Sequence, residues 1–185
     1  MFAKIDDLVH RGDRPAAVKQ LRHIIRLHPS LQPAYSRLAE LTGSAATFEH
    51  AAALAPTSAH AAWAAGHALH REGLLDHASA WLEAAARLAP SGALWSDLGI
   101  VLKQAGRRPE ALAAYSHAVW LSPAHAQAYN NLGVALQEEG DALGARRAYA
   151  AALRAAPRLS AAVPLNMSVP ANPNPNPDPQ PRHGP

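Results

Sequence analysis

Histidine, tryptophan and arginine side chains gather in one short stretch where their types and spacing could do chemistry. His67 and His70 lie three residues apart, His60 and Trp63 precede them at helical spacing, and Arg71 follows. Two imidazoles at i and i+3 share one face of a helix and could bind a metal ion. The chain has no cysteine, and no Asp or Glu shares that face, so we expect no metal site here.

The rest of the sequence carries no catalytic constellation. It has no glycine-rich phosphate loop, no nucleophile elbow, no HExxH motif and no paired carboxylates that would face a pocket. Asp6 and Asp7 are adjacent, so on a helix they would point to different sides. We therefore expect a protein that is not an enzyme and uses no cofactor.

Composition narrows the class of protein further. The 185 residues suffice for one compact domain or a short repeat array, and the apolar 49% is rich in alanine, which favours helix. The N-terminus has no apolar signal-peptide core, and no stretch is long enough to span a membrane, so we expect a cytoplasmic protein without a membrane partner. The net charge is +3, but the pairs Arg107-Arg108 and Arg146-Arg147 alternate with acidic residues, so we do not expect nucleic-acid binding.

A pattern at residues 129–140, YNNLGVALQEEG, has a counterpart at residues 95–106, WSDLGIVLKQAG. Apolar spacings of three and four predict one helix in each copy, Gly140-Asp141 predicts a turn, and a second helix follows. Each copy is therefore expected to be an antiparallel helix pair that buries its apolar face against its neighbours. The matching positions are Trp95, Leu98, Gly99, Leu102, Gly106, Ala111, Tyr115, Ala118 and Pro123, and, in the later copy, Tyr129, Leu132, Gly133, Leu136, Gly140, Ala145, Tyr149, Ala152 and Pro157.

Weaker copies of the pattern precede these two. In the second copy, Phe48 follows Thr42 much more closely than Tyr149 follows Leu136 in the last copy. Part of the unit is therefore missing between the two positions, and the second helix of this copy must be short or irregular. The five expected copies are residues 1–31, 32–58 (shortened), 59–91, 92–125 and 126–159.

The spacing of aromatic, Leu-Gly, Leu, Ala, aromatic, Ala and Pro resembles the tetratricopeptide repeat (TPR) family. The resemblance covers about residues 1–159 and implies an all-α fold, a right-handed α-solenoid of stacked antiparallel helix pairs. It also implies a concave groove that binds a protein or peptide, lined by the first helix of each copy. Carried over residue by residue, the groove positions are His60, Trp63, His67, His70, Arg71, Ser96, Lys103, Gln104, Asn130, Asn131, Val134 and Gln137. The same face includes Ala93, Ile100, Gln127 and Glu138, with Pro33, Ser36 and Glu40 in the second copy.

Two interpretations of the third copy remain open. Trp63 could anchor a partner while the histidines, Arg71 and Lys103 donate hydrogen bonds to an acidic group. Alternatively, Trp63 turns inward to replace the small Ala62 in the core and the histidines are solvated.

The C-terminal segment, 160–185, differs in character. Prolines at alternate positions from 173 to 181 forbid helix, so we expect a disordered Pro/Asn-rich tail. Pro164 falls where a capping helix would propagate, and the last helix pair is therefore expected to expose an apolar strip. That strip would allow self-association or docking of a partner, or would mark the chain as a shortened relative of a longer array.

The sequence thus predicts a non-catalytic scaffold that binds a protein or peptide. The stretch AYNNLGVALQEEG also resembles the repeats of O-linked N-acetylglucosamine transferases, and such arrays commonly precede a glycosyltransferase or sulfotransferase domain. The resemblance places Asn131 on an asparagine ladder, but Arg37, Ala64 and Asp97 hold the counterpart positions. On that alternative the chain is a segment that recruits substrates. A clamp for carboxylate termini is a third alternative, supported only by Asn131 and Lys103.

Overall fold

The computed structural model of the chain describes residues 2–156, and the expected tail and Pro157 lie outside these residues. The described part contains ten helices and no strand, so the all-α solenoid prediction is confirmed. No helix in this part has the length and apolar character needed to cross a bilayer. The helices are α1 (Ala3–His10), α2 (Arg14–Leu27), α3 (Gln32–Thr42), α4 (Ala45–Ala53), α5 (Ala59–Arg71), α6 (Leu75–Leu88), α7 (Gly92–Gln104), α8 (Arg108–Leu121), α9 (Ala126–Glu138) and α10 (Ala142–Ala155).

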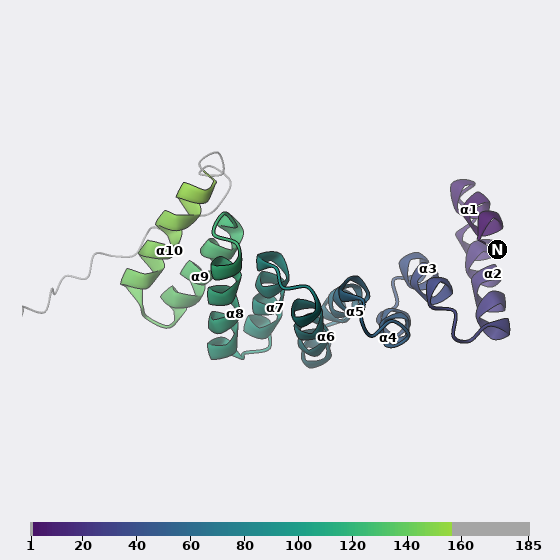
Figure 1. The fold of residues 1–185 in the computed structure, drawn as a ribbon, viewed down its shortest axis with the longest axis horizontal. Coiled ribbons are helices and arrows are strands. Elements are labelled where there is room, and N and C mark those ends of the chain that lie inside the picture. Colours follow the sequence, from purple (N-terminus) through teal and green to yellow (C-terminus); the bar gives the residue numbers. More distant parts are fainter. Residues whose placement is uncertain (1, 157–185) are drawn as a thin grey trace, which may run out of the picture.

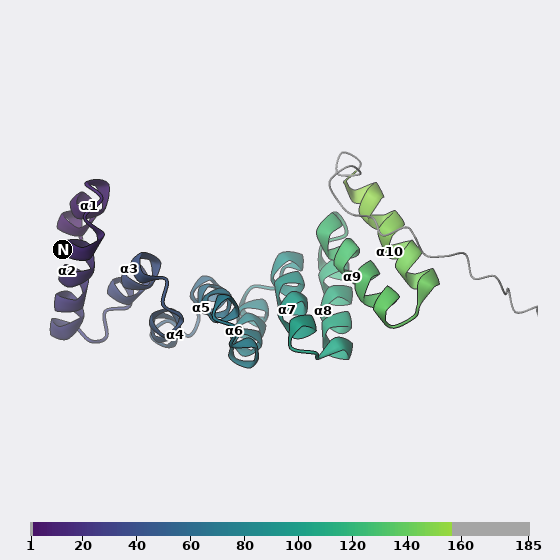
Figure 2. The same ribbon diagram turned by 180° about the vertical axis from the view of Figure 1, so that it is seen from behind.

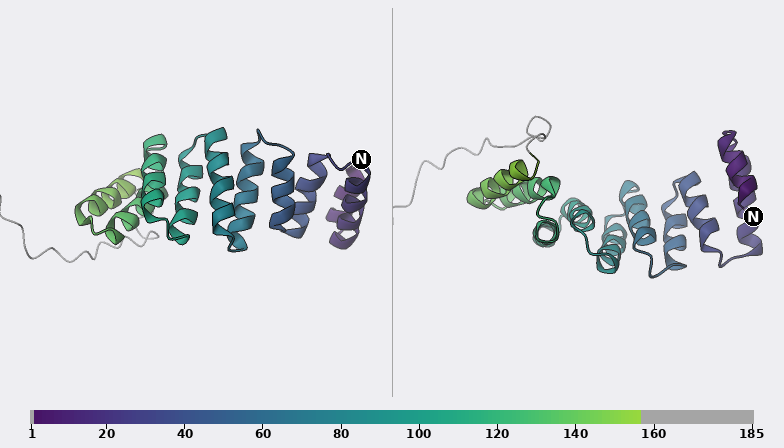
Figure 3. Two further views of the ribbon diagram at one scale, coloured as in Figure 1. Left: turned by 90° about the horizontal axis from the view of Figure 1, so that it is seen from below. Right: turned by 45° about the horizontal axis from the view of Figure 1, so that its top comes forward.

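The helices follow one another along the longest axis of the molecule, from α1 and α2 at one end to α9 and α10 at the other (Figure 1). The view from behind shows the same order, and the side view shows the helices standing next to each other in a row (Figures 2 and 3). The pairs α5–α6, α7–α8 and α9–α10 make the most extensive contacts. The chain is therefore a stack of helix pairs in which each pair meets only its neighbours.

A tyrosine packed on a glycine holds the two best-matched pairs together. A Cβ atom on Gly99 would lie 2.5 Å from Cε1 of Tyr115, and one on Gly133 would lie 2.5 Å from Cε1 of Tyr149. Both tyrosines are among the largest fully enclosed side chains, at 2% and 0% exposure. Burial, followed by the negative charge of Glu138, raises the pKa of Tyr115 to about 12. The ring can lie flat against the first helix because glycine has no side chain.

Short polar turns join the two helices of a pair. Gly140 has a φ of 84°, which an L residue with a side chain rarely adopts. The amide of Asp141 donates to the carbonyl of Leu136 at 2.9 Å, and the Asp141 carboxylate accepts from the amide of Gly144 at 2.8 Å. The Gly-Asp dipeptide thus ends α9 and caps α10.

The second pair differs from the others because its second helix is short. Helix α4 has 9 residues, whereas α8 has 14. Aligned on Phe48 and Tyr115, α4 lacks the first turn of α8. Its N-cap residue, Ser44, gives no side-chain hydrogen bond. Instead, the Glu72 carboxylate, at the end of α5, accepts from the amide of Ala45 at 2.9 Å.

Replacing Gly99 by alanine tests the glycine–tyrosine contact. The added methyl group overlaps the ring of Tyr115, so we expect Gly99→Ala to lower the free energy of unfolding by about 1–3 kcal/mol in chemical denaturation, although alanine is the better helix former. In a double-mutant cycle with Tyr115→Leu, the methyl group should cost less, because the ring atoms it meets are gone. Equal costs in the two backgrounds would contradict this account of the contact.

Candidate functional site

The predicted groove residues of the last three copies lie on α5, α7 and α9, each the first helix of its pair, and those of the second copy lie on α3. We call the surface they share the first-helix surface. Its residues occupy equivalent positions one repeat length apart, so side chains from neighbouring helices can meet. The predicted members are His60, Trp63, His67, His70 and Arg71 on α5, Ser96, Lys103 and Gln104 on α7, and Asn130, Asn131, Val134 and Gln137 on α9.

Asp97 joins α5 to α7 at the centre of this surface. Its Oδ2 atom accepts a hydrogen bond from Nε1 of Trp63 at 3.0 Å and lies 3.1 Å from Nε2 of His67. The Trp63 and His67 rings are stacked at a tilt, with centroids 4.5 Å apart. Trp63 is half-buried and packs against the central core cluster. The tryptophan therefore has one side in the core and its indole N–H on the surface.

The environment of Asp97 favours its charged form. Burial raises the pKa of the carboxyl group, but hydrogen bonds from His67 and Trp63 and the charges of His67 and His125 lower it more, and the net pKa lies below the ordinary 3.8. Asp97 therefore stabilises the folded chain above that pH, and this contribution is lost as the pH falls through the lowered pKa.

Amide side chains continue the row from α7 to α9. Nδ2 of Asn131 donates to Oγ of Ser96 at 3.3 Å, and Oδ1 of Asn131 accepts from Nε2 of Gln127 at 3.0 Å. Asn130 is only 8% exposed, and its Oδ1 accepts no hydrogen bond from the described part of the chain. Gln137 accepts from the hydroxyl group of Tyr149 at 3.0 Å. This end of the surface is polar and carries no charge.

Two further contacts lie along the edge of the first-helix surface. Nε2 of His70 lies 2.6 Å from Oε1 of Gln104, and Nζ of Lys103 lies 2.7 Å from Oε1 of Glu138. Both partners of the Lys103 ion pair are about one-third exposed, at 32% and 38%. The charge of Lys103 is thus balanced by a residue of the next pair.

In the third copy, Trp63 packs toward the core, as one of the two interpretations expects. Trp63 contributes to the core and also presents its N–H to the surface, while His60 and Arg71 are exposed and Val134 is half-buried. His67 and His70 contact different partners, and no three His, Asp or Glu side chains gather as metal ligands within residues 2–156.

Asp97 was absent from the predicted groove positions, whereas Glu138 was among them without its ion pair to Lys103. Asp97 follows Trp63 by 34 residues and Glu138 follows Lys103 by 35, which is about one repeat length. A comparison of donors and acceptors at that offset along the sequence would have indicated both contacts.

A related contact occurs at the N-terminal end of the stack. Arg37 on α3 forms an ion pair with Asp6 on α1. Beside them lies a cavity of about 520 Å³, whose lining includes the predicted Pro33, Ser36 and Glu40. Arg37 and Asp97 hold equivalent positions, so the same position on the first helix bonds to the preceding pair in both cases.

Replacing Asp97 by asparagine tests the centre of the surface. We expect Asp97→Asn to lower the free energy of unfolding at pH 7 by about 1–2 kcal/mol, because a neutral amide is a weaker acceptor for Trp63 and His67. The difference from wild type should shrink as the pH falls below 3.8, where the wild-type carboxyl group takes up a proton. Denaturation at several pH values measures both effects. The exposed Glu139→Gln is the control, with an expected change within about 0.5 kcal/mol, and a pH-independent loss for Asp97→Asn would contradict the electrostatic account.

Comparison with known proteins agrees with this geometry. Models of the tetratricopeptide repeat match residues 59–91 and 126–159, and a TPR repeat model matches residues 99–140. None of the curated proteins compared with the chain matches it.

Several solved structures share the fold. The MamA protein is 20% identical, with 87% of this chain and 92% of that chain covered and a TM-score of 0.75. A MamA fragment from Desulfovibrio magneticus RS-1 is 18% identical, with coverages of 82% and 90% and a TM-score of 0.68. YrrB, described as a TPR protein with an unusual peptide-binding site, is 19% identical, with coverages of 83% and 84% and a TM-score of 0.71. The repeat matches and the stacked helix pairs lead to one conclusion: the chain belongs to the tetratricopeptide repeat family.

Proposed function

We propose that this protein is a non-catalytic scaffold that binds a peptide or an extended protein segment on the first-helix surface. The observation that carries the proposal is the row of half-buried polar side chains that crosses α5, α7 and α9 and is held by hydrogen bonds between neighbouring helices. The five copies over residues 1–159 would act as one binding unit. The peptide-binding site named for YrrB is consistent with this use of the fold.

Pre-organisation of the row supports binding. The rotamers of Trp63, Asp97 and Asn131 are fixed by contacts to a neighbouring helix, so a ligand need not order these side chains. Ordering a flexible side chain costs about 0.5–1.5 kcal/mol on association. A surface fixed in this way retains more of its contact energy as affinity.

The amide side chains of the row favour recognition of a peptide through its backbone. Asn131 and Gln137 present amide groups, which can donate to and accept from a peptide backbone.

The charges on the same surface argue against a strongly acidic ligand there. Lys103 is paired with Glu138, and Asp97 places a carboxylate beside Trp63. A clamp for a terminal carboxylate needs unpaired cations at successive copies, and this row does not offer them within the described helices. We therefore propose a ligand that packs an apolar side chain on Trp63 and forms backbone hydrogen bonds with the amide side chains.

Affinity capture followed by mass spectrometry identifies partners, and titration calorimetry with the purified partner then tests the surface. We expect Trp63→Ala/Lys103→Ala to weaken binding about tenfold or more, because an aromatic anchor at the centre of an interface commonly contributes over 1–2 kcal/mol. Helical circular dichroism checks that the variant remains folded.

The matched control is Trp120→Ala/Arg147→Ala. It removes the same kinds of side chain from the second helices α8 and α10, where Trp120 is 72% exposed. Binding should be unchanged in this control. Equal affinities for wild type and Trp63→Ala/Lys103→Ala would rule out the first-helix surface as the binding site.

A further inference from the structure

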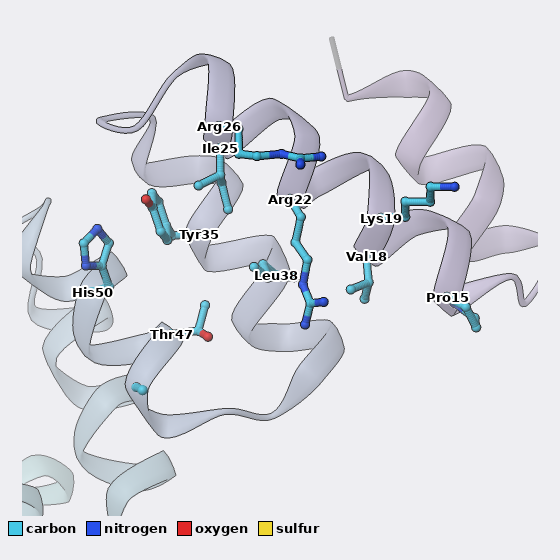
Figure 4. A pocket seen from close by; sticks show the side chains of 11 residues that line it. Pro15, Val18, Lys19, Arg22, Ile25, Arg26, Tyr35, Leu38, Thr47 and His50 are labelled. Carbon is cyan, nitrogen blue, oxygen red and sulfur yellow. The ribbon is translucent and has the colours of Figure 1, made fainter.

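A second surface lies between the second helices of the first two pairs, away from the first-helix surface. It is a groove of about 700 Å³ between α2 and α4, with α3 as its floor (Figure 4). We call it the basic groove. Arg22 points from α2 toward Leu38 and Thr47 across the opening. Its lining residues are Pro15, Val18, Lys19, Arg22, Ile25, Arg26, Tyr35, Leu38, Ala46, Thr47 and His50.

The same groove recurs two copies later in a smaller form. Between α6 and α8 lies a cavity of about 370 Å³ lined by Trp95, Leu98 and His117 at the positions of Tyr35, Leu38 and His50. In both, an aromatic ring stacks on the histidine with centroids 4.3 Å apart. The two sites are thus equivalent in the repeat, and the basic groove is about twice as large.

The missing turn of α4 explains the difference in size. At the other site, Arg107 is the N-cap residue of α8. It donates to Oγ of Ser79 at 3.2 Å and pairs with Glu110, and both charged residues line the cavity. The shortened copy has no residues in the place of this first turn. The corresponding end of the basic groove is therefore left open.

The charge of the groove also differs between the two sites. Lys19, Arg22 and Arg26 lie on one face of α2 and are exposed, and no acidic side chain lines the groove. None of the three forms an ion pair within residues 2–156. At the other site, the residue equivalent to Arg22 is the acidic Glu83. Three unpaired cations of α2 thus border an apolar lining made by Val18 and Ile25 on α2 and by Leu38 on the α3 floor.

We propose that the basic groove binds an acidic peptide segment that places a large apolar side chain on this floor. Carboxylates flanking that side chain would pair with Lys19, Arg22 and Arg26, since charge-assisted hydrogen bonds to Arg are strong and geometrically specific. This site is independent of the first-helix surface, where Lys103 and Asp97 already have partners, and would give the scaffold a second partner.

The lining favours a peptide over a nucleic acid. Single strands need free aromatic faces on which bases stack, together with a basic track that continues along the backbone. Here the ring of Tyr35 is already stacked on His50, and the floor is mostly aliphatic. The cations are confined to one helix, which suits a short segment with a few carboxylates.

Fluorescence anisotropy on the full chain tests the proposal. The probes are labelled nine-residue peptides rich in Glu with a central Leu, Phe or Trp, matched peptides with Gln in place of Glu, and a labelled oligouridylate of similar length. We expect the acidic peptides to bind, the Gln peptides to bind about tenfold more weakly or worse, and added salt to weaken the acidic complexes.

Two variants locate the site. Arg22→Glu/Arg26→Glu reverses the charge of the groove and should weaken binding about tenfold or more, and Ala46→Trp should weaken it by filling the groove without changing charge. The controls Arg146→Glu/Arg147→Glu, which reverses an exposed basic pair on α10, and Trp63→Ala/Lys103→Ala should leave affinity unchanged. Circular dichroism verifies the fold of each variant.

Three results would overturn the proposal. One is that no acidic peptide of the set binds. Another is that reversal on α10 weakens binding as much as reversal on α2, because the attraction would then be diffuse. The third is that the oligouridylate binds more tightly than every peptide and loses affinity in Arg22→Glu/Arg26→Glu, which would make the groove a nucleic-acid site.

Discussion

The contact between a tyrosine ring and a glycine is the constraint from which the rest of the array follows. Tyr115 on Gly99 and Tyr149 on Gly133 set how closely the two helices of a pair approach. With that distance fixed in successive pairs, equivalent side chains of neighbouring first helices come within hydrogen-bond reach. The bonds of Asp97 to Trp63 and His67 depend on this regularity.

The second pair shows what happens where the constraint is relaxed. Ala39 stands in the place of the glycine, Phe48 replaces the tyrosine and is only half-buried, and α3 and α4 contact each other less extensively than later pairs. The lost turn exposes a face of α2 that a full-length helix would partly cover. The same array thus carries two different surfaces. On the first-helix surface Lys103 is paired with Glu138, whereas Lys19, Arg22 and Arg26 in the basic groove form no ion pair within residues 2–156.

Much of the fold could be predicted from the sequence, because the spacings of Leu98, Gly99 and Tyr115 are themselves the packing contacts. The repeat register likewise assigns Trp63, Lys103 and Asn131 to first helices. The ion pair of Lys103 with Glu138 could not be predicted from one copy, because it joins two copies. The spacing of Lys19, Arg22 and Arg26 places them on one helix face, but the groove beneath them arises from a deletion in a different copy, so no single stretch of sequence contains it.

The Glu72 carboxylate that caps α4 affects how the array unfolds. In most repeat proteins each unit carries its own intrinsic stability, and neighbours add an interface term. Here the start of α4 depends on a side chain at the end of α5, through the bond from the amide of Ala45. The stability of α4 is therefore coupled to that of α5, because unfolding of the end of α5 would remove the acceptor that caps α4.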